Sequence, residues 1–506
     1  MTKRILTLAL AVVMTAALFT GGGQSAFAAE DGSAEEITVG IASDLDSSLD
    51  PHVSSSLAGT REVLFNVYEG LLKPDTQGNL IPAVAESYTV NDTADEYTFT
   101  LREGVRFHDG SEVTVGDVVY SLTRAAGLET GEPLVATLAG VASVEAPDDS
   151  TVVVTLSAPD AEFAAYMTAA IIPEGSDPAD GIIGTGPFKY VSRSPQENVV
   201  IERFDDYWGE PAKCAKVTFK IIEDGQAMVM GLHSGAIDLA AHLDASQAAE
   251  LSELNVLEGS MNLVQAMYLN NARPPFDDAR VRQALCYAVD KHMVIDLACD
   301  GHGAALGSSM YPAFVRFFDE SLTDYYAPDM EKAVALLTEA GYSEADPLRF
   351  TIAVVEAYTP HVNTAQAVVE LLRQTGMVEA EILPMENATW YSEAYQGRDF
   401  DATITGMDAS TLTASALLAR FVSDNAKNFI GFDSADYDAA YAAAVSATDT
   451  DGQTEKFKEC ERILTENAAN VYIQDLADFV VTQTDIEGYE FYPLYVMDMS
   501  TVRRVG

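Results

Sequence analysis

The side chains best suited to bind a metal or move a proton are seven histidines, and they are widely separated along the sequence. No histidine lies four residues from another, and there is no H-E-x-x-H pair of the kind that holds zinc on one helical face. We therefore expect no metal site. The histidines are His52, His108, His233, His242, His292, His302 and His361.

Short glycine-rich and acidic motifs do not match the patterns of nucleotide-binding or calcium-binding loops. Gly184-Thr185-Gly186 and Gly301-His302-Gly303 lack the third glycine and following helix of a nucleotide-binding loop. Asp449-Thr450-Asp451-Gly452 resembles a calcium loop, but its glycine comes too early. The sequence has neither a G-x-S-x-G elbow nor a catalytic cysteine signature. We expect no cofactor and no enzymatic activity, with a secreted hydrolase as one alternative.

The composition indicates a large folded protein with a strongly acidic surface. The chain has 506 residues, is 48% hydrophobic and carries a formal charge of −49. Removing residues 1–28 deletes two basic and no acidic residues, so 27 basic and 78 acidic side chains leave −51. Such a charge repels nucleic acid, so we expect no nucleic-acid partner. It is compatible with selectivity for cationic ligands, but solubility and a highly charged exterior are the favoured explanation, because net charge informs about association and not about a particular site.

The N-terminus reads as a secretory signal. Lys3 and Arg4 precede an apolar run over residues 5–19, and Ala26-Phe27-Ala28 fits a cleavage site. The run is shorter than the roughly 18–20 residues of a spanning helix, so cleavage after residue 28 is favoured over a membrane anchor. The first cysteine is Cys214, so we expect no lipid anchor and a mature protein that is periplasmic or extracellular.

Four cysteines in a chain of this length do not form a disulfide framework. Cys286 and Cys299 lie on two consecutive expected helices and could pair. Buried free cysteines are common in protein cores, so both states stay open.

The elements that would position a site are those of an α/β protein. Residues 36–41 and 216–222 read as strands, the second followed by a helical stretch at 226–231. In the second half, strands at 348–355, 378–383 and 400–405 alternate with helices near 364–375 and 390–395. This order implies a mostly parallel sheet, in which ligands bind beyond the carboxyl ends of the strands. Gly406 and the residues after it are therefore a candidate site.

The block over residues 97–122 is the most informative segment. Tyr97, Phe99 and Leu101 alternate with polar residues as in a half-buried strand. Thr114 and Asp117 resemble a capping box, ahead of a helix whose apolar residues share one face. Physical reasoning assigns this block a structural role.

The block and eight further segments, in order, resemble the family 5 extracellular solute-binding proteins, the oligopeptide, dipeptide and nickel receptors of ABC importers. The resemblance covers nearly the whole mature chain. The further segments are 49–52, 66–72, 82–87, 184–188, 204–209, 235–238, 275–285 and 288–291.

The resemblance implies a two-lobed periplasmic-binding-protein fold with an extra inserted domain. The ligand cleft would lie between lobes joined by two hinge crossings, near Tyr268-Leu269-Asn270 and near Val471-Tyr472. Lobe one would comprise residues 29–72, 183–266 and 473–506. The inserted domain would comprise residues 73–182, and lobe two residues 267–472.

The resemblance also implies where a peptide ligand would bind. Peptide receptors of this family hold the ligand's α-amino group with an aspartate a few residues after a glycine–aromatic pair. Counting from Gly406, Met407 replaces the usual aromatic residue and Ser410 the usual aspartate. Asp408 lies two residues early. Either Asp408 binds the amine through a shifted loop, or the ligand has no free amino terminus.

Further ligand contacts follow from the same resemblance. Trp390 and Tyr472 match cleft aromatics, although each could equally be a core residue. Lobe one would approach the ligand backbone through one short segment, and the first crossing would contribute two side chains. These residues are Ser55, Ser56 and Leu57 in the segment, and Tyr268 and Asn270 at the crossing.

We therefore expect a monomeric, exported receptor that captures peptides and delivers them to ABC permease subunits. One alternative keeps the fold but changes the ligand to a metal chelate, haem or another small solute. A second is an adhesion or sensor module that reuses the fold, since fold does not determine function.

Overall fold

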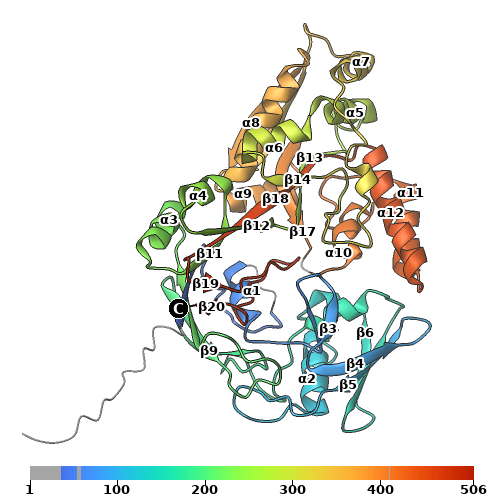
Figure 1. The fold of residues 1–506 in the computed structure, drawn as a ribbon. Coiled ribbons are helices and arrows are strands. Elements are labelled where there is room, and N and C mark those ends of the chain that lie inside the picture. Colours follow the sequence, from blue (N-terminus) through green and yellow to red (C-terminus); the bar gives the residue numbers. More distant parts are fainter. Residues whose placement is uncertain (1–35, 54–57, 180, 410, 506) are drawn as a thin grey trace, which may run out of the picture.

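The structure is a computed structural model that describes residues 36–53, 58–179, 181–409 and 411–505. Its largest element is a mixed twelve-stranded sheet that runs through the molecule (Figure 1). Two of these strands, β12 (Asn255–Ser260) and β14 (Gly303–Ala305), pair with β18 off the main path. The main path is β16 (Val378–Met385), β15 (Leu348–Val355), β17 (Ala402–Asp408), β13 (Leu263–Leu269), β18 (Asn470–Thr482), β11 (Leu239–Leu243), β1 (Glu36–Ile41), β10 (Lys216–Ile221), β9 (Asn198–Arg203) and β8 (Phe188–Ser194).

β18 belongs to both halves of this sheet. Its first part pairs with β13 and β14, and its second part, from Ala477 onward, pairs with β11 and β12. β12 and β13 follow each other with only Met261 and Asn262 between them. The two chain crossings therefore lie near Met261-Asn262 and at Leu476-Ala477.

These crossings are several residues away from the positions expected from the sequence. Tyr268 and Tyr472 instead lie within the β13–β18 pairing of lobe two. β18 continues through Leu476-Ala477 without a break, so no local signal marks that crossing. Between β12 and β13 the chain is interrupted at Met261 and Asn262, where Asn262 has a φ of 58°. The exact domain ranges stay a prediction.

The predicted β-α-β-α-β region of lobe two is confirmed. β15 pairs in parallel with both β16 and β17. β13 and β18 are antiparallel to their neighbours, so the whole sheet is mixed and not mostly parallel as expected. The helices of lobe two are α5 (Ala279–Ala288), α6 (Lys291–Cys299), α7 (Met330–Ala340), α8 (Thr359–Arg373), α9 (Asn387–Trp390), α10 (Ala414–Leu418), α11 (Ala435–Ser446) and α12 (Thr450–Glu466).

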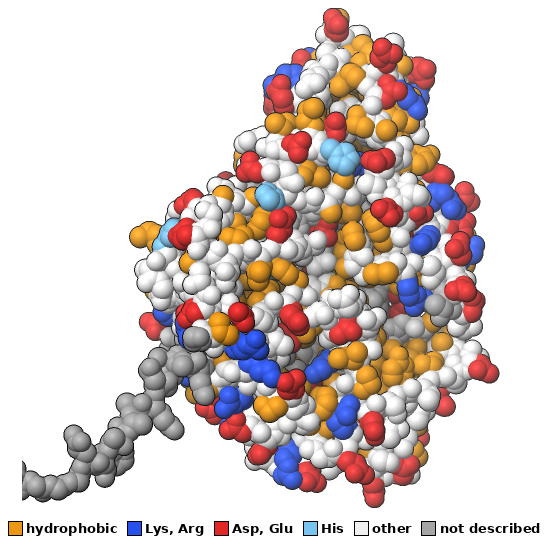
Figure 2. Space-filling model, in the orientation of Figure 1, with side chains coloured by type: hydrophobic (Ala, Val, Ile, Leu, Met, Phe, Trp, Pro, Cys, Tyr) orange, Lys and Arg blue, Asp and Glu red, His pale blue; other side chains and the backbone are white. Residues whose placement is uncertain are grey.

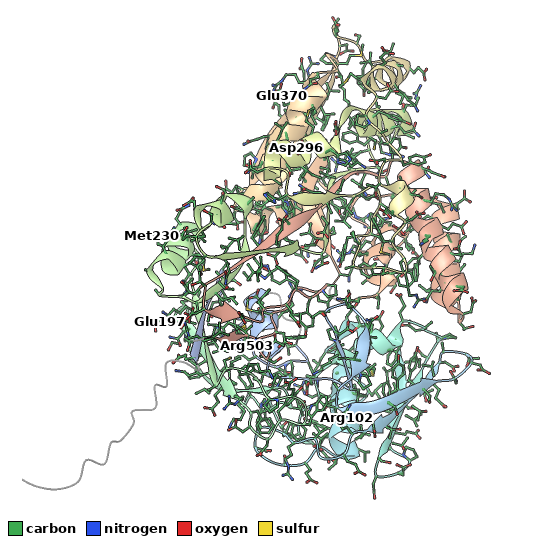
Figure 3. The ribbon with its side chains drawn as sticks, viewed as in Figure 1. Arg102, Glu197, Met230, Asp296, Glu370 and Arg503 are labelled. Atoms are coloured by element: carbon green, nitrogen blue, oxygen red, sulfur yellow. The ribbon has the colours of Figure 1, made fainter. Side chains whose placement is uncertain are left out.

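Both faces of the lobe-two sheet are buried, as the side chains of β15 show. Phe350 and Ile352 pack in one hydrophobic cluster, whereas Ala353 and Val355 pack in another. The covering helices direct their polar residues outward: Figure 3 shows Asp296 on α6 and Glu370 on α8 at the surface. Burial on both faces explains the near-continuous apolar character of these strands.

Lobe one surrounds the other half of the sheet. β1 pairs in parallel with β10 and β11, and the predicted strand at 36–41 is confirmed. Figure 1 places this half below the lobe-two half in the view. Its remaining elements are α1 (Ala58–Leu64), α3 (Gly225–Ser234), α4 (Ala245–Glu250), β19 (Ile486–Glu487) and β20 (Arg503–Arg504).

The inserted domain has its own sheet, in the order β4-β5-β7-β6, covered by a single long helix, α2 (Val115–Ala126). Tyr97 and Phe99 are buried in its core, as predicted. A short ribbon of two strands joins it to lobe one. The strands are β2 (Leu72–Pro74), β3 (Leu80–Pro82), β4 (Ala85–Val90), β5 (Glu96–Leu101), β6 (Val141–Glu145) and β7 (Thr151–Leu156).

Five short helical turns complete the described elements, and none of the described helices is long and apolar enough to cross a bilayer. The predicted signal peptide, residues 1–28, lies outside the described residues. The turns are η2 (Ala136–Leu138), η3 (Phe163–Thr168), η4 (Glu320–Leu322), η5 (Tyr391–Gln396) and η6 (Ala419–Phe421).

The capping box predicted for α2 is confirmed and extends further than the sequence indicated. The Asp117 carboxylate accepts hydrogen bonds from the Thr114 backbone N–H and hydroxyl, both at 2.7 Å. Its second oxygen accepts from the Glu174 backbone N–H at 2.8 Å. Asp117 therefore joins the start of α2 to a loop far along the chain.

Replacing Asp117 with alanine should destabilise the inserted domain by roughly 2–3 kcal/mol, because three donors would lose a charged acceptor. Urea unfolding monitored by circular dichroism would measure this loss. Asp149→Ala, at an exposed turn position of the same domain, serves as the matched control and should change stability by less than about 0.5 kcal/mol. Equal effects of both substitutions would contradict this assignment.

Candidate functional site

Of the expected site residues that the structure describes, Asp408 is the one whose side chain emerges toward lobe one. It stands at the carboxyl end of β17, with 48% of its side chain exposed. Met407 is buried in a hydrophobic cluster. At Gly406, an added Cβ would approach the Leu263 side chain to 3.0 Å, so a larger residue would crowd β13.

Asp408 faces an arginine from the opposite lobe. Its Oδ2 atom lies 3.7 Å from Nη1 of Arg61 on α1, and the Arg61 guanidinium lies 5.3 Å from the centre of the Tyr495 ring. A second arginine, Arg420 of η6, donates to the Asp408 backbone carbonyl at 3.3 Å. Two guanidinium groups therefore converge on the end of β17, in a protein whose visible surface is rich in carboxylates (Figure 2).

The Arg61–Asp408 ion pair is a contact that a ligand could replace. Both side chains are partly exposed, and the atoms are at the outer limit of a salt bridge. Exposed pairs of this kind contribute about 0–1 kcal/mol. Their separation by a cationic ligand group would therefore cost little.

A buried charge cluster lies beside Arg61. His242 of β11 contacts Glu62 through Nε2 at 2.8 Å and Asp478 of β18 through Nδ1 at 3.1 Å. Its ring stacks on Tyr495, with ring centres 4.1 Å apart. Although burial alone would lower the His242 pKa, Asp478 and Glu62 outweigh it and raise the pKa to about 10. A charged imidazolium therefore holds α1, β11 and β18 together at neutral pH.

His242 also adopts an unusual backbone conformation. Its φ is 60°, in a region that non-glycine residues rarely occupy, and the pairing of β11 with β18 is irregular at this position. The two carboxylates and the Tyr495 ring hold the side chain in place. The sequence suggested only a lone histidine here, because its partners lie 180 and 236 residues away along the chain.

A second titratable group lies at the crossing itself. Asp475 of β18 is buried and accepts a hydrogen bond from the Leu263 backbone N–H at 3.1 Å. Burial raises its pKa to about 7, against the opposing effect of this hydrogen bond and of the Asn262 N–H. Its carboxyl group thus joins the two chain segments that connect the lobes.

The expected cleft aromatics lie in the core of lobe two. Trp390 is 8% exposed and its indole N–H donates to Thr403 Oγ1 at 2.9 Å. Tyr472 is 5% exposed, and its hydroxyl hydrogen-bonds Ser309 Oγ at 2.6 Å. Both environments are those of the core alternative that the sequence left open.

The two residues assigned to the first crossing also have internal partners. The Tyr268 hydroxyl donates to the Val264 carbonyl, and the Asn270 amide donates to the carbonyls of Arg398 and Phe400. Both side chains are almost fully buried, at 1% and 2% exposure. In this structure they support the end of β13, since that strand continues past the crossing into lobe two.

The remaining expected site residues, Ser55, Ser56, Leu57 and Ser410, lie outside the described residues. Within the described part of the chain, no group of three or more His, Cys, Asp or Glu side chains is arranged to hold a metal ion. Cys286 and Cys299 are both free thiols there, so the pairing that the sequence left open does not occur in the structure.

The family model for the bacterial extracellular solute-binding proteins, family 5 Middle, matches residues 79–429. The chain belongs to this family. As a family 5 member it is a non-enzymatic receptor that binds a small solute for an ABC importer. The expectations of this family and of a two-lobed α/β fold are therefore confirmed.

Three curated relatives indicate how widely ligands differ among similar proteins. The periplasmic oligopeptide-binding protein OppA of Haemophilus influenzae is 24% identical over 490 residues, covering 87% of this chain and 88% of the relative. The glutathione-binding protein GsiB of Salmonella typhimurium is 28% identical, covering 85% and 87%. The heme-binding protein A of Haemophilus influenzae is 27% identical, covering 81% of each.

Solved structures agree in fold. The substrate-binding protein CtaP of Listeria monocytogenes superposes with a TM-score of 0.83 at 22% identity, covering 93% of this chain and 99% of that one. NikZ of Campylobacter jejuni, solved in complex with Ni(L-His), gives a TM-score of 0.79 at 20% identity, covering 93% and 100%. At these identities the likeness establishes the fold alone.

The His242 cluster makes a prediction about alkaline pH. The folded pKa of about 10 exceeds the unfolded value of about 6.5, so the stabilisation is complete below pH 6.5 and disappears as the pH rises through 10. We expect the unfolding free energy to fall by on the order of 2–4 kcal/mol between pH 7 and 10.5. Urea unfolding at both pH values would measure this change.

His242→Gln is the control for other groups that titrate in this range. The variant should be less stable than the wild type at pH 7 and should lose much less stability on going to pH 10.5. An equal loss in both proteins would show that another group is responsible.

Proposed function

We propose that this family 5 protein captures short peptides through their free α-amino group, with Asp408 as the carboxylate that binds the amine. The observation that carries this proposal is the position of Asp408: it is the half-exposed side chain at the carboxyl end of β17, and it faces α1 across the lobes. An ammonium group would replace the Arg61 guanidinium beside the same oxygen. The usual family position, Ser410, cannot supply a carboxylate.

The displaced Arg61 would remain available to the peptide. Its guanidinium lies over the Tyr495 ring, which keeps it at the lobe junction after the ion pair is broken. A guanidinium binds carboxylates and carbonyl oxygens with directed hydrogen bonds. Arg61 and Asp408 together would therefore suit a small zwitterion better than a large neutral solute.

The names of two relatives support a peptide ligand, and the name of a third supports the main alternative, a haem or metal chelate. OppA and GsiB are named for an oligopeptide and for glutathione, itself a tripeptide. Heme-binding protein A is named for a different ligand, so a haem or metal chelate stays the second candidate. The arrangement at Asp408 favours a cationic group in the ligand, which favours the peptide.

Export and closure of the lobes would precede delivery of the peptide. Residues 1–28 would direct export and be removed, leaving a periplasmic or extracellular monomer. Lobe one (29–72, 183–266 and 473–506), carrying the inserted domain (73–182), would close against lobe two (267–472) around the peptide by a hinge movement at the crossings. The closed receptor would then deliver its peptide to ABC permease subunits.

Native mass spectrometry of the purified full chain tests the ligand class. We expect a series of bound masses that correspond to di- and oligopeptides, because backbone recognition tolerates many side chains. A single non-peptide mass, such as that of haem or of a metal chelate, would reject the peptide.

Asp408→Asn tests the proposed role of the carboxylate. It should weaken binding of an identified peptide by more than tenfold in calorimetry, because a charged hydrogen-bonded pair is lost. N-acetylation of the same peptide should weaken its binding to the wild type by a similar factor. Asp433→Asn, at an exposed position of the same lobe, should leave the affinity unchanged. Unchanged affinity in Asp408→Asn would exclude this role.

A further inference from the structure

The inserted domain touches lobe two directly, next to the proposed peptide site. The Glu162 carboxylate accepts hydrogen bonds from the backbone N–H groups of Ala414 at 2.7 Å and Ser415 at 3.2 Å. These two residues begin α10. The N-cap residue of α10, Thr413, makes no capping hydrogen bond with its own side chain. Glu162, more than 250 residues earlier in the chain, takes its place.

The segment that Glu162 holds is the continuation of β17. Asp408 ends that strand, and the chain then runs through α10 to η6, where Arg420 returns to the Asp408 carbonyl. The result is a loop closed at its base by Arg420 and held at its tip by Glu162. Both contacts therefore bear on the chain segment that follows the residue proposed to bind the ligand amine.

A second part of the inserted domain contacts the same loop. Gly78 lies in the turn between β2 and β3 with φ of 79°, and a Cβ added there would lie 3.3 Å from the Leu412 side chain. The Asp75 carboxylate shapes this turn by accepting the backbone N–H groups of Gln77 and Asn79. Figure 1 shows α10 above β3, consistent with this contact.

We infer that Glu162 is a positioning residue of the ligand site: it is the point at which the inserted domain grips residues 411–419 when the lobes meet, and so helps to set the place of Asp408. This inference rests on the proposed binding of ligand at Asp408. It gives the inserted domain a role in ligand capture in addition to its own packing.

The surroundings of Glu162 make this grip sensitive to pH. The titratable groups that face it are Asp160 on its own loop, Tyr166 on η3 and Tyr441 on α11. Burial raises the Glu162 pKa to about 6, against the lowering effect of Ser415 and the two N–H groups. Without the contact to α10 the carboxyl would be more exposed, and its pKa would return toward the ordinary glutamate value of 4.5.

The direction of the pH effect follows from these two values. Glu162 binds a proton more tightly in the gripped state than in the separated state. Protonation therefore stabilises the gripped state, most strongly below pH 4.5, and this stabilisation declines as the pH rises through 6. We expect the ratio of gripped to separated protein to be roughly fivefold to tenfold higher at pH 5 than at pH 7.5.

Hydrogen–deuterium exchange of residues 411–420 tests the inference. Exchange would be measured at one pH in the full chain, with and without an enzymatic casein hydrolysate as the peptide source. Glu162→Ala should increase exchange of this segment severalfold, because two N–H groups lose their acceptor. Glu162→Gln, whose amide keeps one of the two acceptor oxygens, should restore part of the protection. Glu145→Ala, at an exposed glutamate of the same domain, should have no effect.

Small-angle scattering at pH 5 and pH 7.5 supplies the second readout. The wild type should become more compact at pH 5, and Glu162→Gln should lose that response while remaining folded. Equal exchange in the wild type and Glu162→Ala under both peptide conditions would overturn the inference. Failure to bind any peptide would instead count against the proposed function, since the exchange difference without hydrolysate does not depend on it.

Discussion

The backbone pairing of β18 is the constraint on which the rest of the structure depends. A buried strand must satisfy its N–H and C=O groups along its whole length. β18 does so with β13 and β14 in one half of the molecule and with β11 and β12 in the other. The two halves of the molecule are therefore joined by paired strands whose partners change near Met261 and Leu476.

Basic side chains lie at this junction, although the protein as a whole is strongly acidic. A protein with a formal charge of −49 places His242, Arg61 and Arg420 among the carboxylates where the lobes meet. The buried imidazolium is paired twice, whereas Arg61 and Asp408 form a partly exposed pair. The twice-paired buried imidazolium is the harder of the two interactions to break, because burial determines how much a pair contributes.

The local patterns of the sequence predicted much of the fold. The strands at 36–41 and 348–355 have the expected bounds, and the Thr114–Asp117 box begins α2 as expected. The ordered segments also identified the family. The crossings expected near Tyr268 and Tyr472 differ from the point at which β18 changes partners, because the unbroken β18 carries no turn residue there.

The candidate site was harder to predict from the same patterns. Asp408 was proposed by counting from Gly406 and stays a prediction, whereas Trp390, Tyr268, Asn270 and Tyr472 are hydrogen-bonded within the core. Arg61 and Glu162 went unnoticed, and His242 was noted only as an isolated histidine. Nothing in the residues next to them in the sequence indicates the partners that they meet in the fold.

The sequence by itself determined the elements, the family and the carboxylate at the end of β17, since each depends on residues close together in the chain. Only the tertiary structure decided which side chains meet: Arg61 with Asp408, His242 with Glu62 and Asp478, and Glu162 with the start of α10. These contacts join residues more than a hundred positions apart. Local periodicity carries no information about such pairs, because they form only when the sheet brings distant strands and loops together.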